Sequence, residues 1–255
     1  MRLILCLLVF VLSNPIHAQP SSDSAKPSVT LAFGEYPPYY GNDLHNKGFI
    51  SEIVVEAYTL AGYEVELVYL PPWQRRVEET KNGRFDGLIS MWHSADRERW
   101  FLFSNPLPAN EVGFYKHVES DFTLQGVDSL ASARVGTVRG FINPPEINDA
   151  GAVIEEVTHL NQNIAKLIKQ RIDIALVDRA VGRHILVSLY PEHKDDLVYI
   201  EPSIALLNQY LVISRKAEDA EEKLNAFNRG YAILKQQGEV VRLATKYGIE
   251  PTIVD

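Results

Sequence analysis

The residue whose type and position most clearly suggest chemistry is an arginine just after an apolar run. Residues 83–106 read GRFDGLISMWHSADRERWFLFSNP, which predicts a short strand, a polar turn and the start of a helix. Ser94 is a good N-cap candidate, and Arg97 three positions later lies in the first turn. There the helix dipole disfavours a cation by roughly 0.3–1 kcal/mol. An anionic ligand group at the end of the strand would compensate, although an ion pair with Asp96 or Glu98 is the simpler alternative.

Familiar catalytic and metal-binding motifs are absent from the sequence. It contains no Gly-x-Ser-x-Gly elbow, His-Glu-x-x-His, P-loop or Gly-x-Gly-x-x-Gly. Cys6 is the only cysteine, and it lies in the N-terminal apolar run, so thiol catalysis and Cys-ligated zinc are excluded from the rest of the chain. The histidines lack the close spacing of metal ligands, and we predict neither a metal nor a cofactor.

The N-terminus has the features of a secretory signal. Arg2 precedes an apolar run over residues 3–12 that is too short to span a membrane, and Asn14 and Pro15 end it. Cleavage after Ala18 would remove residues 1–18, and the polar residues 19–27 read as a flexible leader. Cys6 is too near the terminus to be a lipid-attachment site. We therefore expect a soluble periplasmic protein.

Charge and hydropathy limit the classes of partner. The chain has 25 basic and 33 acidic residues, a formal net charge of −8, and loss of Arg2 lowers it by one more. An acidic surface argues against nucleic acid and anionic membranes as general partners. No second apolar run is long enough to insert in a membrane.

Strand and helix patterns alternate along the chain in two series, which indicates an α/β fold with parallel strands and helical crossovers. The first series has strands at 29–33, 65–70 and 87–91, with helices at 49–61 and 72–81. The second has strands at 134–138, 153–157, 172–177 and 197–200, helices at 161–170 and 179–188, and a turn or short helix at 143–149. A strand at 206–214 and helices at 217–237 and 239–247 complete the chain.

Ligands on such sheets bind beyond the carboxyl ends of the strands, which selects residues 35–40, 91–97, 139–143 and 178–179. Arg139 could add a second positive group there, although a solvent-facing arginine is the simpler expectation. Arg75 and Arg76 are expected on a helix surface. Glu35 is a weak candidate for contacting a ligand amine.

Seven stretches in the right order resemble the extracellular solute-binding proteins of the polar amino-acid uptake type, the periplasmic partners of ABC transporters. The most specific is 94–106, which resembles the family's TxERxxxxxFSxPy, and the others are 34–39, 47–62, 82–87, 134–140, 170–178 and 237–248. The resemblance implies two α/β lobes joined by two hinge crossings, with a ligand cleft that closes between them. Lobe 1 would be residues 28–117 plus 206–250, lobe 2 residues 119–203, and 251–255 a tail.

The resemblance also implies roles for three residues. Arg97 would grip a ligand carboxylate, Asp178 would take its amino group, and Tyr36 would pack on its side chain. Asp178 also follows a strand and precedes a helix, so an N-cap role alone is an equal alternative.

Two positions depart from the family pattern. Phe141 follows Gly140 where the family often has a hydroxyl residue, and Trp92 replaces another small hydroxyl residue. With Tyr36 and Trp73, these side chains would favour an aromatic, heterocyclic or otherwise flat ligand. The alternatives are that the tryptophans belong to the core and that Phe141 plugs the cleft.

The leading function is therefore non-catalytic binding of a small carboxylate-bearing solute by a monomer, for delivery to an ABC permease. A second is presentation of the ligand to a membrane receptor. A third is an enzyme resembling the cyclohexadienyl dehydratases, in which Glu35 or Asp178 would be the general acid beside Arg97 and Arg139.

Overall fold

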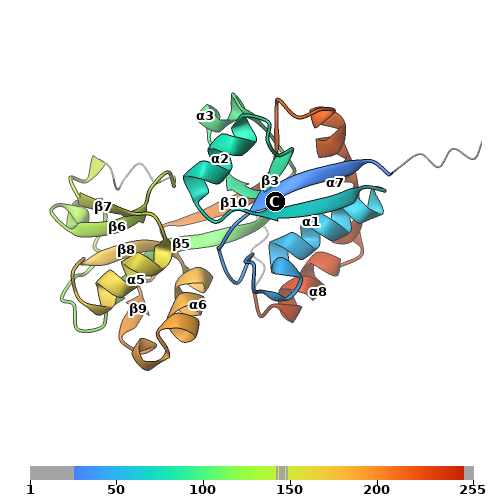
Figure 1. The fold of residues 1–255 in the computed structure, drawn as a ribbon. Helices are drawn as coiled ribbons and strands as arrows, with labels where there is room; N and C mark the ends of the chain where they lie inside the picture. The colour runs from blue at the N-terminus through green and yellow to red at the C-terminus, as the bar shows by residue number, and fades with distance from the viewer. Residues whose placement is uncertain (1–25, 142, 144–146, 148, 250–255) are drawn as a thin grey trace, which may run out of the picture.

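The computed structural model describes residues 26–141, 143, 147 and 149–249, which form a mixed α/β fold with two lobes (Figure 1). Lobe 1 contains strands Ser28–Phe33 (β1), Glu64–Tyr69 (β2), Gly87–Trp92 (β3) and Phe101–Phe103 (β4), and helices Phe49–Leu60 (α1), Trp73–Lys81 (α2), Ala95–Glu98 (α3), Ala220–Gln236 (α7) and Glu239–Lys246 (α8). Lobe 2 contains Arg134–Val138 (β6), Val153–Val157 (β7), Ile174–Asp178 (β8), Leu197–Tyr199 (β9), Leu160–Ile168 (α5) and Arg179–Leu189 (α6). The α/β prediction is confirmed.

Two long strands, Leu107–His117 (β5) and Ala205–Ser214 (β10), run between the lobes (Figure 1). The strand order is β2-β1-β3-β10-β5-β8-β6-β7, with β4 on β10 and β9 on β5. β5 pairs antiparallel with β10 through Val112, opposite Ala205, and Val112 is also where its pairing with β8 begins, opposite Asp178. One continuous backbone ladder therefore links the two lobes. The boundaries of the lobes along the chain stay a prediction.

The first three strands of each predicted series are parallel, but β9, the last strand of the second series, pairs antiparallel with β5 instead of joining them. β1 pairs in parallel with β2 and β3, and β6 pairs in parallel with β7 and β8. The sequence analysis missed β4 and β5. β5 is buried at almost every position on both faces and includes Pro108, so it shows neither the alternation nor the propensity that marks a strand.

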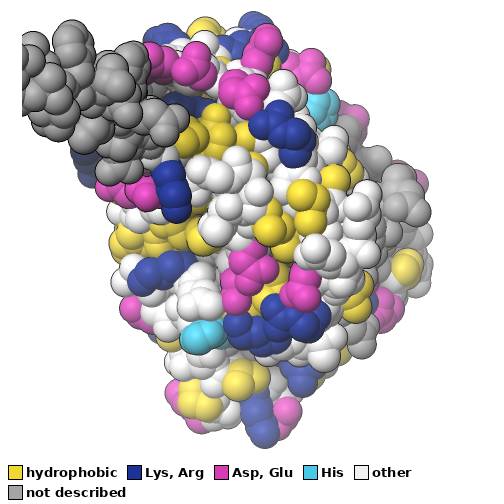
Figure 2. Space-filling view, turned by 90° about the vertical axis from the view of Figure 1, so that its right-hand side faces the viewer, with side chains coloured by type: hydrophobic (Ala, Val, Ile, Leu, Met, Phe, Trp, Pro, Cys, Tyr) yellow, Lys and Arg dark blue, Asp and Glu magenta, His cyan; other side chains and the backbone are white. Residues whose placement is uncertain are grey.

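The helices of lobe 1 cover its sheet with a shared core. Phe49, Ile50, Ile53 and Val54 of α1 are fully buried, as the helical spacing predicts, but Leu60 at the end of that face is 47% exposed because α1 ends there. Of the helices in the described ranges, none is long and apolar enough to cross a membrane. Figure 2 shows the face of lobe 1 turned away from lobe 2, where acidic and basic side chains are interspersed with apolar ones.

The remaining predictions lie outside the described residues. These are the signal at 1–18, nearly all of the leader at 19–27, part of the turn or helix at 143–149, and the tail at 251–255.

Gly230 on α7 lets this helix approach α1 at backbone distance. A Cβ built on Gly230 would lie 1.8 Å from the carbonyl oxygen of Ala57. We expect Gly230→Ala to lower the free energy of unfolding by about 1–3 kcal/mol, despite a gain of about 1 kcal/mol in helix propensity. Urea unfolding of this variant and of the exposed α7 control Gln236→Ala measures the effect. Equal or higher stability of Gly230→Ala would contradict the proposed close contact.

Candidate functional site

A cavity of about 380 Å³ lies between the lobes. Lobe 1 contributes to its lining five of the residues singled out from the sequence, namely Glu35, Tyr36, Trp73, Trp92 and Arg97. Lobe 2 contributes Phe141 and the residues at the start of α5 and along α6. Six of the eight candidate site residues therefore share one cavity, because the strand ends that carry them meet at one edge of each lobe.

Phe141 is the centre of an aromatic cluster that crosses the cleft. Its ring centroid lies 5.6 Å from that of Trp92, 5.7 Å from Trp73 and 6.3 Å from Tyr36, each in an edge-on arrangement. Edge-on pairs of this kind contribute about 0.5–1.5 kcal/mol beyond their buried area. Phe141 comes from lobe 2 and its three partners from lobe 1, so in this structure it lines the cavity and also holds the lobes together.

The carbonyl oxygen of Gly140 adds a polar contact across the cleft. It accepts hydrogen bonds from Trp73 Nε1 at 3.0 Å and from Arg97 Nη2 at 3.2 Å. Gly140 has a φ of +78°, a conformation that favours glycine. The turn at Gly140 therefore presents its carbonyl and the Phe141 ring to lobe 1.

The loop after β1 supplies the tyrosine side of the cavity. The Tyr36 amide donates to the Tyr40 carbonyl at 2.8 Å, and the Tyr36 ring stacks on Tyr39 and Tyr40 with centroids 5.8 and 5.6 Å away. All three rings are buried. The prolines at 37 and 38 keep this loop out of regular secondary structure, and the stacked tyrosines make the loop part of the core.

Arg97 is a partly buried cation without a carboxylate partner. Nη1 donates to the Trp92 carbonyl at 2.7 Å, and no acidic oxygen of the described residues lies within 4 Å of the guanidinium. Burial lowers the pKa of Arg97 to about 10. The surface ion pair considered above is therefore wrong in this conformation.

The helix dipole does not oppose the charge of Arg97, contrary to our expectation from the sequence. Ser94 takes the N-cap position, but its side chain makes no capping hydrogen bond, and α3 has only four residues. So short a helix has little dipole to oppose a cation. The charged form of Arg97 is instead disfavoured by desolvation, because the guanidinium is partly buried.

Arg76 also lines the cavity, against our expectation that it lies on the helix surface. It is only 4% exposed, and Nη1 donates to the carbonyls of Leu70 and Pro71 at 2.6 and 2.9 Å. Arg75 does lie on the surface, where it pairs with Glu79 at 2.6 Å. Position 76 is three residues after Trp73, which puts both on the inward face of α2.

Two further charged candidates, Glu35 and Arg139, differ in position. Glu35 lines the cavity and is exposed, and its Oε1 accepts from the Asn42 amide at 3.0 Å. Arg139 does not line the cavity, and its Nε lies 3.3 Å from Glu156 Oε2 on the surface. Arg139 is the first residue of the turn that follows β6.

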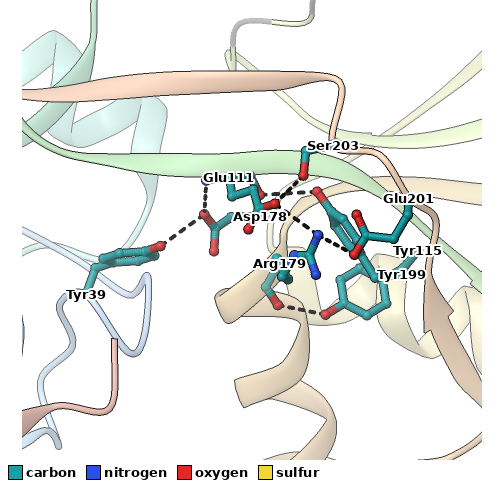
Figure 3. Close-up of polar contacts among 8 residues, drawn as sticks. All are labelled: Tyr39, Glu111, Tyr115, Asp178, Arg179, Tyr199, Glu201 and Ser203. Atoms are coloured by element: carbon teal, nitrogen blue, oxygen red, sulfur yellow. Dashed lines mark hydrogen bonds and ion pairs between the residues drawn. The ribbon is translucent and has the colours of Figure 1, made fainter. Parts of the chain in front are cut away.

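Asp178 is an N-cap in this structure. Its Oδ1 accepts from the Val181 amide at 2.9 Å. Its Oδ2 accepts from the Glu111 amide at 3.0 Å and from Tyr39 Oη at 3.2 Å (Figure 3). It is 1% exposed and is not among the residues that line the cavity. Burial raises the pKa of Asp178 to about 6, against the lowering effect of its hydrogen bonds. The structure thus supports the capping alternative.

A polar network surrounds the place where β5 changes partner (Figure 3). The Arg179 guanidinium bridges Glu111 of β5 and Glu201, and it lies 4.3 Å over the Tyr199 ring. Ser203 donates to Glu111 as well. Both connections between the lobes are therefore tied to the N-terminus of α6.

Sequence reasoning missed two kinds of cavity residue. His184 of α6 lines the cavity, and burial lowers its pKa. Asn110 of β5 is fully buried there and accepts from Trp92 Nε1 at 2.7 Å. Only recognition of β5 as a strand could have placed Asn110. The described ranges contain no cluster of three or more metal-ligating side chains.

The fold and the cavity between its lobes define a two-lobed binding protein, and comparison with known proteins gives the family. The chain belongs to the bacterial extracellular solute-binding proteins, family 3, whose sequence pattern matches residues 30–250. This confirms the resemblance found in the sequence. None of the curated proteins compared with the chain matches it significantly.

Solved structures show the same fold at low sequence identity. A histidine kinase sensor domain similar to periplasmic binding proteins is 23% identical, with a TM-score of 0.76 over 89% of this chain and 98% of that one. A mutant of the arginine-binding protein of T. maritima is 19% identical, with a TM-score of 0.73 over 87% and 95%. The GluR0 ligand-binding core of Nostoc punctiforme, in complex with L-glutamate, is 18% identical, with a TM-score of 0.73 over 86% and 98%.

The raised pKa of Asp178 predicts an unusual pH dependence of stability. The pKa is about 6 in the folded protein and about 3.9 in an unfolded chain, so the folded state holds the proton more tightly. The free energy of unfolding should fall by about 2 kcal/mol relative to Asp178→Asn as pH rises from 4 to 7. Denaturant unfolding of both proteins across this range measures the difference. If the stability of the wild type relative to Asp178→Asn stays constant or increases with pH, the three hydrogen-bond donors lower the pKa of Asp178 by more than burial raises it.

The aromatic cluster predicts that Phe141 favours the closed arrangement of the lobes. Phe141→Ala removes three ring contacts across the cleft and should disfavour this arrangement by about 1–3 kcal/mol. Small-angle scattering should then show a larger radius of gyration, and tryptophan emission should shift to the red. Val187→Ala on the exposed face of α6 is the control. An unchanged radius of gyration would contradict a role of Phe141 in closure.

Proposed function

We propose that this protein binds a small carboxylate-bearing solute, an amino acid or an aromatic or heterocyclic relative, in the cavity between its lobes. The binding is non-catalytic and takes place in the periplasm, and a single chain forms the whole site. The closed, loaded form is recognised by the permease of an ABC transporter. Membership of the solute-binding family and the position of the cavity between two hinged lobes support this proposal.

Arg97 is the observation that carries the proposal. A guanidinium has five N–H donors in a planar fork that matches a carboxylate, and two atoms of Arg97 donate to backbone carbonyls. The remaining donors meet no carboxylate of the described residues. A ligand carboxylate would therefore gain charge-assisted hydrogen bonds without breaking an existing ion pair.

Closure would enclose the rest of the ligand in aromatic surface. Tyr36, Trp73 and Trp92 line the lobe 1 side, and Phe141 approaches them from lobe 2. Flat apolar groups pack well on such rings. An amino group on the ligand would lie toward Glu35, the carboxylate that lines the cavity and was singled out from the sequence.

A thermal-shift screen of the mature protein against amino acids, aromatic acids and heterocyclic acids tests the proposal. A ligand that binds only the folded form raises the melting temperature by mass action. Arg97→Gln should weaken binding of a hit by about 10- to 100-fold, because a hydrogen bond to a charged group contributes about 1.5–3 kcal/mol. Titration calorimetry gives the affinities, and chromatography of the recovered hit should show it unchanged.

Arg99→Gln is the matched control, because Arg99 is exposed in the same segment and pairs with Asp96. Its affinity for the hit should equal that of the wild type. A hit that Arg97→Gln binds equally well would remove Arg97 from the site, and conversion of the hit to product would replace binding with catalysis.

A further inference from the structure

Two guanidinium groups approach the same indole ring inside the cavity. Arg97 Cζ lies 5.5 Å from the ring centroid of Trp73, and Arg76 Cζ lies 5.2 Å from it. The two arginines come from different elements, α3 and α2. Both line the cavity, so both positive charges reach the space that a ligand would occupy.

The backbone around Arg76 is shaped to hold its guanidinium. A Cβ built on Gly34 would lie 2.0 Å from Arg76 Nη1, so the missing side chain of Gly34 leaves the space in which this group lies. The carbonyls of Leu70 and Pro71 fix Nη1 from the other side. Nη2 has no hydrogen-bond partner in the part of the chain that the structure describes.

Neither guanidinium has a carboxylate partner. The described acidic side chains include none within 4 Å of Arg76 or Arg97, although the charge of Glu35 acts on Arg76 from further away. Burial of an unpaired cation carries a desolvation penalty of several kcal/mol. Burial accordingly lowers the pKa of Arg76 and of Arg97. Two such penalties in one cavity are relieved together by a ligand with two negative groups.

We propose that the cavity selects a flat acid with two anionic groups, one on Arg97 and the second on Arg76, the two guanidinium groups that lie near the Trp73 ring. This inference rests on the proposed function and names its ligand class. A planar dicarboxylate places two charges at the ends of a surface that packs on an indole. A second neutral or cationic group in the same position would leave Arg76 unpaired.

Matched probes that differ only in the second charge test the inference. Calorimetric titration of the wild type compares benzene-1,3-dicarboxylate with benzoate, and L-glutamate with L-glutamine. At least one dianion should bind 10-fold or more tightly than its monoanionic or neutral partner. Arg76→Met should abolish this preference, whereas Arg97→Gln should weaken both members of the pair. Arg75→Met, on the exposed face of the same helix, should leave the preference unchanged.

Arg76→Lys provides a second variant if loss of the buried guanidinium destabilises lobe 1. It keeps the charge without the fork and should retain a preference reduced at least several-fold, in a protein shown to be folded by its unfolding curve. The inference would be overturned if the wild type bound both members of each probe pair equally well, or bound neither dianion. It would also be overturned if Arg76→Met kept the preference for the dianion. A monoanion hit lost in Arg97→Gln, without a dianion preference, would leave the proposed function standing.

Discussion

The arrangement of both lobes depends on one point in the β5 strand. Up to Val112 it pairs with β10, and from Val112 onward it pairs with β8 and then also with β9, so the two lobes share a continuous ladder there. The carboxylate of Asp178, opposite Val112, accepts from the amide of the preceding β5 residue, Glu111, and from Tyr39 of lobe 1 (Figure 3). It also accepts from an amide at the start of α6. A single buried carboxylate thus fixes the direction of α6, and with it the lobe 2 wall of the cavity.

This use of Asp178 changes the polarity of the site. The resemblance to the family gave Asp178 a ligand amine, but an oxygen pair that already accepts three hydrogen bonds at 1% exposure has little capacity left for a cation. The carboxylate that does line the cavity, Glu35, is exposed. The buried part of the lining is instead cationic and aromatic, because Arg76 of α2 and Arg97 of α3 both lie near the Trp73 ring.

The sequence predicted which residues line the cavity where a local rule places them. It did not do so where a tertiary contact determines the position of the side chain. Tyr36, Trp92 and Phe141 follow strands, and the strand-end rule brings them together regardless of detail. β5 was missed because burial on both faces removes alternation, and Asn110 was missed with it. Arg75 and Arg76 look identical in sequence. Arg76 is buried and Arg75 exposed only because Arg76 lies on the same face of the helix as Trp73. The inward face cannot be recognised from the sequence, because α2 is short and polar.

The groups that hold the lobes together in this structure are the ones to which the proposed function assigns the ligand. Arg97 and Trp73 both donate to the Gly140 carbonyl, and Phe141 lies among the rings that would pack on a ligand. A carboxylate arriving at Arg97 would therefore compete with a neutral carbonyl for the same guanidinium, and the charged acceptor forms the stronger bond. Because the carbonyl belongs to lobe 2, its displacement would loosen one closing contact while the ligand itself bridges the lobes. The aromatic contacts of Phe141 do not depend on that carbonyl, so they can keep the lobes close while the exchange takes place.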